Sequence, residues 1–222
     1  MAKKKEFSGK ACLEASRWAD DMKTWPEGQR ERIEKRVDEL LEENAWFQSA
    51  DNHGHLSNLC IGLALYEMYL SEGKTKEEAT RLTAEPMWAY VEKGAGLYRK
   101  AARIPGALKL IGTAMKKGGE RWDAPGWEYT YEVTTSKEFR FTCHRCIYRD
   151  IYEKYGCVEL GRIFCHADVI NYGSLPGHTF TREHTLCMDG QECDFLITKD
   201  SREKRKADRE KKKAEREKGE NG

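Results

Sequence analysis

The sequence lacks any long apolar run. In its 222 residues no stretch reaches the roughly 20 apolar residues that a membrane-spanning helix needs. Polar and charged residues, among them Glu6 and Lys10, follow the basic start where a signal peptide would have its apolar core. We therefore expect a cytoplasmic protein with no membrane partner.

An excess of charge of one sign is also lacking. The chain has 39 basic and 38 acidic residues, a formal net charge of +1, whereas nucleic-acid-binding domains usually carry a basic excess. The basic surplus lies in residues 199–222, which hold 11 basic and 7 acidic side chains. This segment is typical of a charged, solvated tail, favoured over a tail that binds nucleic acid or an acidic partner. We expect no nucleic-acid partner.

Several functional motifs are missing. No glycine-rich phosphate loop precedes a helix, and no Gly-x-Ser-x-Gly elbow occurs. The spacing Cys-x-x-Cys occurs once, at Cys143 and Cys146, without the second pair that would indicate a structural zinc site. No metal ligands are therefore assigned. The cofactor stays unknown, and zinc is possible but not favoured.

What the chain does have is a change of periodicity near its middle. Helical spacing predicts helices at 11–25, 31–47, 55–71, from Thr75 onward, at 87–103 and at 106–115, with Pro86 interrupting the fourth or starting a new segment, and a linker at 116–126. We expect residues 1–116 to form a helical region that packs on the rest, residues 117–198 an α+β domain, and residues 199–222 the tail.

The second half alternates between strand and helix patterns. Strands are predicted at 127–133, 139–143, 179–188 and 192–198, the last two joined by a hairpin at Asp189-Gly190, with helices at 146–155 and 158–172 between the pairs. This order predicts an α+β fold: a helical N-terminal half, then a four-stranded antiparallel sheet with helices on one face.

Eight cysteines in a reducing compartment favour thiols over disulfides. Cys146 starts a predicted helix, where the helix dipole favours a thiolate, and Cys165 shares a helix face with Asp168. Cys193 stands beside Asp194 after the last turn. If the helices cover the sheet, these three thiols converge on one side. Cys143, Cys157 and Cys187 are interpreted as ordinary packed thiols, and His184 as a rim residue of a strand.

The stretch from Cys146 to Phe195 resembles the L-2-amino-thiazoline-4-carboxylic acid hydrolase family. The matching residues are Cys146, Gly156 with Glu159-Leu160, Phe164–Asp168, Phe180–Leu186, Gly190 and Cys193–Phe195. The resemblance implies a hydrolase that opens small cyclic amidines or isothioureas, and a small-molecule substrate.

Such chemistry needs a nucleophile, a proton donor and a cation for the substrate's carboxylate. The family resemblance makes Cys165 or Cys193 the candidate nucleophile and Asp168 or Asp194 the proton carrier. Arg182, His184 and Cys146 are the candidate substrate-binding residues, with His166 and His184 as spare acid/base groups.

The hairpin from Glu183 to Phe195 also resembles vinyl-4-reductase-like ligand-binding domains, which implies binding and dimerisation in place of chemistry. Two alternatives therefore stay open beside the hydrolase. One is a non-catalytic small-molecule-binding or sensor module, possible as a homodimer. The other is a metal-binding protein with Cys146, Cys165 and Cys193 as ligands.

Overall fold

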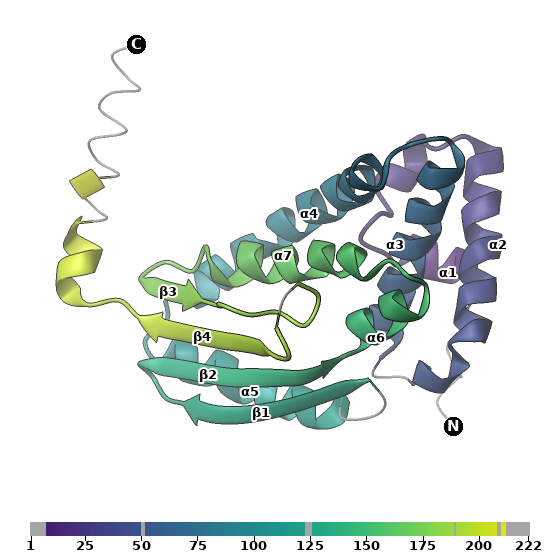
Figure 1. Ribbon diagram of the computed structural model, residues 1–222. Coiled ribbons are helices and arrows are strands. Elements are labelled where there is room, and N and C mark those ends of the chain that lie inside the picture. The colour runs from purple at the N-terminus through teal and green to yellow at the C-terminus, as the bar shows by residue number, and fades with distance from the viewer. Residues whose placement is uncertain (1–7, 50–51, 123–125, 189, 208–209, 212–222) are drawn as a thin grey trace, which may run out of the picture.

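The computed structural model describes residues 8–49, 52–122, 126–188, 190–207 and 210–211. Its first half is helical (Figure 1). The elements are α1 (Gly9–Glu14), η1 (Asp21–Thr24), α2 (Glu27–Glu43), η2 (Ala45–Phe47), α3 (His53–Ser71), α4 (Lys76–Ala101) and α5 (Ala107–Trp122).

The helix predicted at 11–25 is wrong in its length, because the chain leaves the helix at Ala15. The Ser16 hydroxyl donates to the Leu13 carbonyl at 2.8 Å and accepts from the Trp18 N–H at 3.1 Å. A serine that bonds its local backbone in this way competes with the helical pattern. The resulting turn directs the fully buried Trp18 into the core.

Two predicted interruptions further along are also wrong. Pro86 lies inside α4, which runs through it without a break, and α5 continues to Trp122 across part of the predicted linker. A proline withholds one helical donor, here the partner of the Leu82 carbonyl, but Thr83, Ala84 and Met87 around Pro86 are buried. Tertiary packing of α4 therefore offsets the cost of the proline.

The second half forms a four-stranded antiparallel sheet in the order β1-β2-β4-β3, which confirms the predicted fold class. Two helices and a 3-10 turn connect the second and third strands (Figure 1). The elements are β1 (Trp127–Thr134), β2 (Glu138–Cys146), α6 (Ile147–Lys154), η3 (Val158–Gly161), α7 (Arg162–Tyr172), β3 (His178–Thr181) and β4 (Cys193–Lys199).

One face of the sheet carries the helices. Phe139 and Phe141 on β2 are buried, whereas Arg140 between them is exposed, the alternation of a half-covered strand. Helix α5 packs closely on this face, since a Cβ at Gly112 would lie 2.7 Å from the ring of Phe139. On the same face, the Tyr172 ring of α7 lies 6.5 Å from that of Phe195 on β4.

The strand predicted at 179–188 is too long. β3 ends at Thr181, and a loop leads from Arg182 toward β4; Asp189 of the predicted hairpin turn lies outside the described residues. The Asp194 carboxylate accepts the N–H groups of Glu183 and His184 at 3.1 and 2.6 Å. Side chains of β4 thus satisfy backbone donors that a longer strand would have paired.

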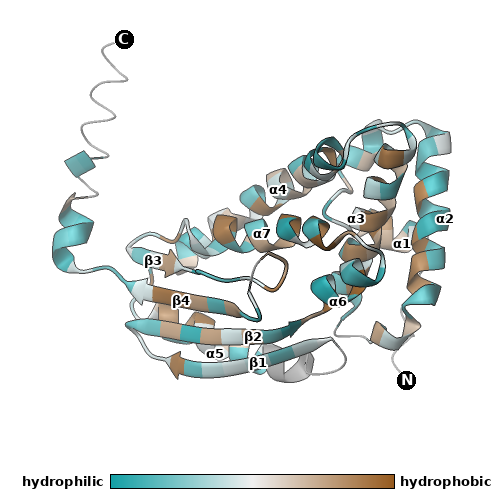
Figure 2. Ribbon diagram, viewed as in Figure 1, coloured by the Kyte–Doolittle hydropathy of each residue, from teal (hydrophilic) through white to brown (hydrophobic). Residues whose placement is uncertain are grey.

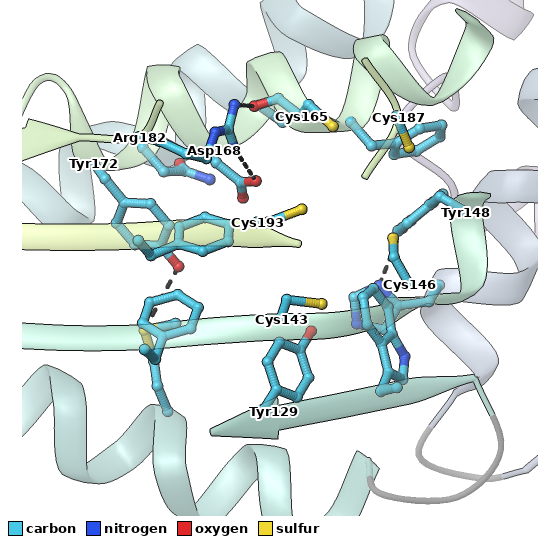
Figure 3. A pocket seen from close by; sticks show the side chains of 18 of the residues that line it. Tyr129, Cys143, Cys146, Tyr148, Cys165, Asp168, Tyr172, Arg182, Cys187 and Cys193 are labelled. Carbon is cyan, nitrogen blue, oxygen red and sulfur yellow. Dashed lines mark hydrogen bonds and ion pairs between the residues drawn. The ribbon is translucent and has the colours of Figure 1, made fainter. Parts of the chain in front are cut away.

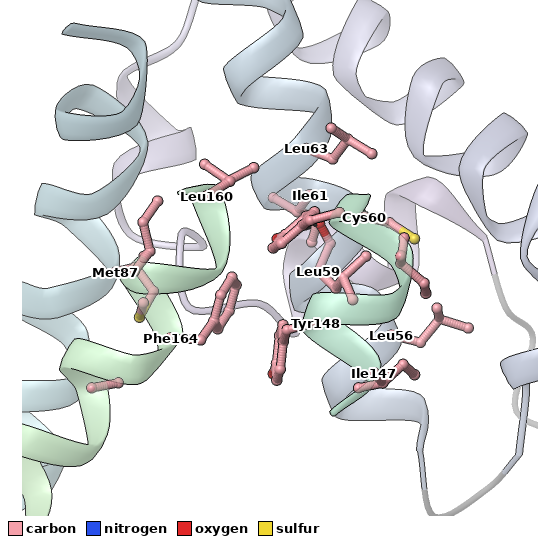
Figure 4. Packing of buried hydrophobic residues seen from close by; sticks show 14 of the residues in the cluster. Leu56, Leu59, Cys60, Ile61, Leu63, Met87, Ile147, Tyr148, Leu160 and Phe164 are labelled. Atoms are coloured by element: carbon pink, nitrogen blue, oxygen red, sulfur yellow. Dashed lines mark hydrogen bonds between the residues drawn. The ribbon is translucent and has the colours of Figure 1, made fainter. Parts of the chain in front are cut away.

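The buried core joins the helical half to the sheet half. Leucines and isoleucines of α3 pack against Ile147 and Tyr148 of α6, Leu160 of η3 and Phe164 of α7 (Figure 4). Helix α2 alternates hydrophobic and hydrophilic stretches (Figure 2) and adds Ile33, Val37, Leu40 and Leu41 to the same core. In the described ranges no helix has the length and apolarity to cross a membrane.

Candidate active site

A cavity of about 310 Å³ lies between the sheet, α6 and α7, and the N-terminal helices. Figure 3 shows thiols from both layers facing this space. They are Cys143 and Cys146 of β2, Cys193 of β4, Cys165 of α7 and Cys187 of the loop after β3. The structure thus brings together the three cysteines predicted to converge, Cys146, Cys165 and Cys193.

Cys193 has the most favourable surroundings for a thiolate. It lies directly opposite Cys143 in the β2–β4 register, and the Leu186 N–H donates to its Sγ at 3.2 Å. A hydrogen bond from the Cys143 thiol, the Leu186 N–H and the charge of Arg182 together lower the pKa of Cys193, although burial opposes them. Thiolate character is what makes a cysteine nucleophilic.

Cys143 is the matching proton donor. Its thiol has two acceptors within reach, the carbonyl of Arg145 at 3.0 Å and the Cys193 sulfur. The hydrogen bond to Cys193 and burial raise the pKa of Cys143. Sequence reasoning interpreted Cys143 as a packed strand residue. Its side chain is buried on the covered face of β2, and that face also lines the cavity.

A second group of thiols lies across the cavity. Interactions with the thiols of Cys146 and Cys165, together with burial, raise the pKa of Cys187. Gly161 makes this arrangement possible, because a Cβ there would lie 2.4 Å from the Cys187 Sγ. Sequence reasoning treated Cys187 as an ordinary buried thiol; its place in the loop between β3 and β4 gave no signal of this role.

Asp168 and Arg182 form an ion pair on the cavity wall, with Nη1 and Oδ2 3.0 Å apart. Burial raises the pKa of Asp168 to about 6, and Arg182 limits the rise. The Asp168 side chain is 35% exposed, whereas that of Arg182 is 7% exposed. Because Asp168 lines the cavity, we attribute its exposed part to the cavity interior.

The guanidinium of Arg182 is held on several sides. Its Nη2 donates to the Cys165 carbonyl at 2.9 Å, and its central carbon lies 5.2 Å from the ring centre of Phe195. An arginine over an aromatic face gains a cation–π attraction. Arg182 is therefore a fixed positive charge beside Cys193 and Asp168.

Asp194 and His184 lie apart from the cavity lining. Asp194 alternates with the buried Cys193 and Phe195, so its side chain lies on the other side of β4 and anchors the loop after β3. His184 is exposed on that loop. Their predicted roles in chemistry and substrate binding stay predictions.

Sequence reasoning missed several polar groups of the cavity, among them Arg17, His55, Tyr129 and Tyr148. His55 Nδ1 lies 3.0 Å from the Tyr148 hydroxyl, and burial lowers the pKa of His55 to about 4. These residues come from distant parts of the chain. Only the alternation of aromatic residues on the strand at 127–133 could have indicated Tyr129.

Within the ranges that the structure describes, no group of three or more His, Cys, Asp or Glu side chains has an arrangement that could hold a metal ion. Two of the cavity thiols are hydrogen-bonded to backbone groups, Cys143 to the Arg145 carbonyl and Cys193 to the Leu186 N–H.

Comparison with known protein families shows to which family the chain belongs. The model of the L-2-amino-thiazoline-4-carboxylic acid hydrolase family matches residues 54–197, which is more than half of the chain. The chain belongs to this family. The residues matched to the hydrolase family include all five cavity cysteines, Asp168 and Arg182, whereas Arg17 precedes them.

Two solved structures of the Fe(II) unliganded H-NOX protein from K. algicida, one of them a mutant, are also similar to this member of the hydrolase family. Each is 9% identical and covers 88% of this chain, with 98% and 97% of the other chain covered and TM-scores of 0.36 and 0.35. No curated protein matches the chain.

Proposed function

We propose that this protein is a hydrolase that opens small cyclic amidines or isothioureas bearing a carboxylate, with Cys193 as its nucleophile. The observation that carries the proposal is the set of contacts at the Cys193 sulfur. Two donors and a nearby guanidinium favour its thiolate inside a cavity that also holds Asp168. Membership of the hydrolase family supports the reaction class.

In the first half of the proposed reaction, the Cys193 thiolate adds to the ring carbon that is bonded to both nitrogen and sulfur. The bond between that carbon and the ring sulfur then breaks, and its electron pair leaves with the sulfur. Asp168 gives this sulfur a proton. An acid with a pKa of about 6 is partly protonated near neutral pH, as a general acid must be.

In the second half, water adds to the same carbon of the isothiourea now attached to Cys193. The Asp168 carboxylate takes up the proton that water releases, and the carbon–sulfur bond to Cys193 breaks to regenerate the thiolate. One water is consumed. With 2-amino-thiazoline-4-carboxylate as substrate, the product is carbamoyl-cysteine with a free thiol.

The test is release of free thiol from 2-amino-thiazoline-4-carboxylate by the purified, reduced protein. We expect turnover by the wild type, and only the buffer rate for Cys193→Ser. Cys157→Ser is the matched control, because Cys157 is also a buried thiol but is not among the cavity-lining residues. It should retain the wild-type rate.

Two outcomes would contradict parts of this proposal. Turnover that survives in Cys193→Ser and is lost in Cys165→Ser would move the nucleophile to Cys165, the other candidate. No thiol release above the buffer rate with wild type would remove this substrate.

A second candidate function, non-catalytic binding of a small molecule, is favoured by the aromatic lining of the cavity. The rings of Phe141 and Phe195 stack at 4.3 Å, and those of Tyr148 and Phe164 at 4.1 Å. Such walls are typical of ligand pockets. Saturable binding of the thiazoline with no thiol release at any pH would support this reading over hydrolysis.

A further inference from the structure

The turn after α1 places a second arginine at the cavity. Arg17 lines it together with Cys193 and Asp168, although it lies far from both in the sequence. Its backbone N–H donates to Oδ1 of Asn58 on α3 at 3.1 Å, and its neighbour Trp18 is fully buried. The backbone that carries Arg17 is therefore fixed on both sides.

The guanidinium of Arg17 has few partners. Its Nη1 lies 3.6 Å from the Met87 sulfur, a weak acceptor. In the part of the chain that the structure describes, no carboxylate lies within ion-pair distance of Arg17. Arg182 differs, because its two terminal nitrogens already bind Asp168 and the Cys165 carbonyl.

The positive charge of Arg17 acts on the cavity. It adds to the effect of burial that lowers the pKa of His55, and it limits the rise that burial causes in the pKa of Asp168. His55, which also lines the cavity, is neutral near pH 7, because burial lowers its pKa to about 4. A cation facing a confined space with unused donors is stabilised when an anion binds it.

We propose that Arg17 binds the carboxylate of the substrate through two parallel hydrogen bonds, while Arg182 stays paired with Asp168. The inference rests on the proposed function, which supplies the substrate class. It adds Arg17 as the residue that selects substrates with a carboxylate. A guanidinium matches the planar geometry of a carboxylate with two donors. The substrate would then lie with its carboxylate at Arg17, on the helical side, and its reacting carbon at Cys193, on the sheet.

The test compares 2-amino-thiazoline-4-carboxylate with 2-amino-thiazoline, which lacks the carboxylate. The wild type should prefer the carboxylated compound. In Arg17→Gln the KM for that compound should rise roughly 10- to 100-fold, the loss expected for hydrogen bonds between charged groups, with a much smaller change in kcat. The KM for the analogue should change far less, and Arg17→Lys should recover part of the preference.

Arg81→Gln is the control, because Arg81 is an exposed arginine on α4 that pairs with the exposed Glu85. It should behave as wild type with both compounds. Unchanged preference in Arg17→Gln, or an equal rise of KM for the two compounds, would overturn the role of Arg17.

A binding measurement separates this inference from the proposed reaction. In a Cys193→Ser background, the shift of Tm on adding each compound reports binding without turnover. If the wild type hydrolyses neither compound, but the carboxylated one binds better and Arg17→Gln removes that difference, the reaction fails and the carboxylate site stands. Equal binding of both compounds, or binding of neither, overturns the site.

Discussion

Cys143 and Cys193 face each other across the antiparallel strands β2 and β4, and a side-chain hydrogen bond with Cys143 is the largest influence that lowers the pKa of Cys193. The pKa of Cys143 is raised and that of Cys193 lowered by this one hydrogen bond. The two thiols therefore differ in acidity, although both residues are buried cysteines on neighbouring strands.

Removing the donor should weaken the thiolate. In Cys143→Ala we expect a higher pKa for Cys193, because the sulfur loses the hydrogen bond that lowers its pKa most. The measurement is the rate of alkylation of Cys193 by iodoacetamide as a function of pH, followed by mass spectrometry. The midpoint should move to higher pH in Cys143→Ala and stay in place in Cys157→Ala. A midpoint unchanged in both variants would contradict the proton donation.

Arg182 should matter for stability as well as for the site. Arg182→Ala leaves Asp168 without its ion-pair partner and the Cys165 carbonyl without its donor. We expect a loss of about 2 kcal/mol in the free energy of unfolding, below the usual value for a buried pair because Asp168 is partly exposed. Urea denaturation measures it. Arg81→Ala, which removes the exposed pair with Glu85, should cost no more than about 0.5 kcal/mol. Equal losses of unfolding free energy in the two variants would argue against a stabilising role of the Arg182–Asp168 pair.

Asp168 should make the stability of the folded protein depend on pH, and its raised pKa gives the sign of that dependence. Its pKa is raised from the ordinary 3.8 to about 6 in the folded protein, so the folded state holds the proton more tightly than the unfolded chain. Its contribution favours folding below pH 3.8 and is lost as the pH rises through about 6. The stability of wild type relative to Asp168→Asn should fall across that interval, as measured by urea denaturation at several pH values. A difference independent of pH would contradict the raised pKa.

Gly161 should tolerate no side chain. A Cβ at this position would lie 2.4 Å from the Sγ and 3.0 Å from the Cβ of Cys187, so Gly161→Ala must displace Cys187 and its loop. Overpacking of this kind costs about 1 to 3 kcal/mol. The double variant with Cys187→Ala should recover part of that loss in thermal denaturation. The control is Gly28→Ala, which has open space around the new Cβ and should cost little stability. If Cys187→Ala recovers none of the loss caused by Gly161→Ala, the close contact between residues 161 and 187 is contradicted.

Much of the fold could be predicted because local patterns determine it. The alternation of Phe139, Phe141 and Cys143 identified the covered face of β2, and helical spacing from Thr75 onward identified the start of α4. The predictions failed where distant contacts override local preference. The packing of α4 tolerates Pro86, and side chains of β4 satisfy the backbone of the loop after β3.

The candidate site was predicted in part for the same reason. Cys146, Cys165, Cys193, Asp168 and Arg182 line the cavity, and helix and strand periodicity had placed these cysteines on one side. The contributions of Cys187 and Arg17 depend on a loop and a turn. Neither has a periodic pattern that tells which way a side chain points.

The turn that carries Arg17 precedes the matched residues 54–197, whereas the cavity thiols lie within them. If Arg17 selects the substrate, recognition and reaction are encoded in separate stretches of the chain. Substitutions in the turn can then exchange one substrate for another while the thiol chemistry stays intact. Relatives with the same cysteines and a different residue in this turn would then share a reaction and differ in what they consume.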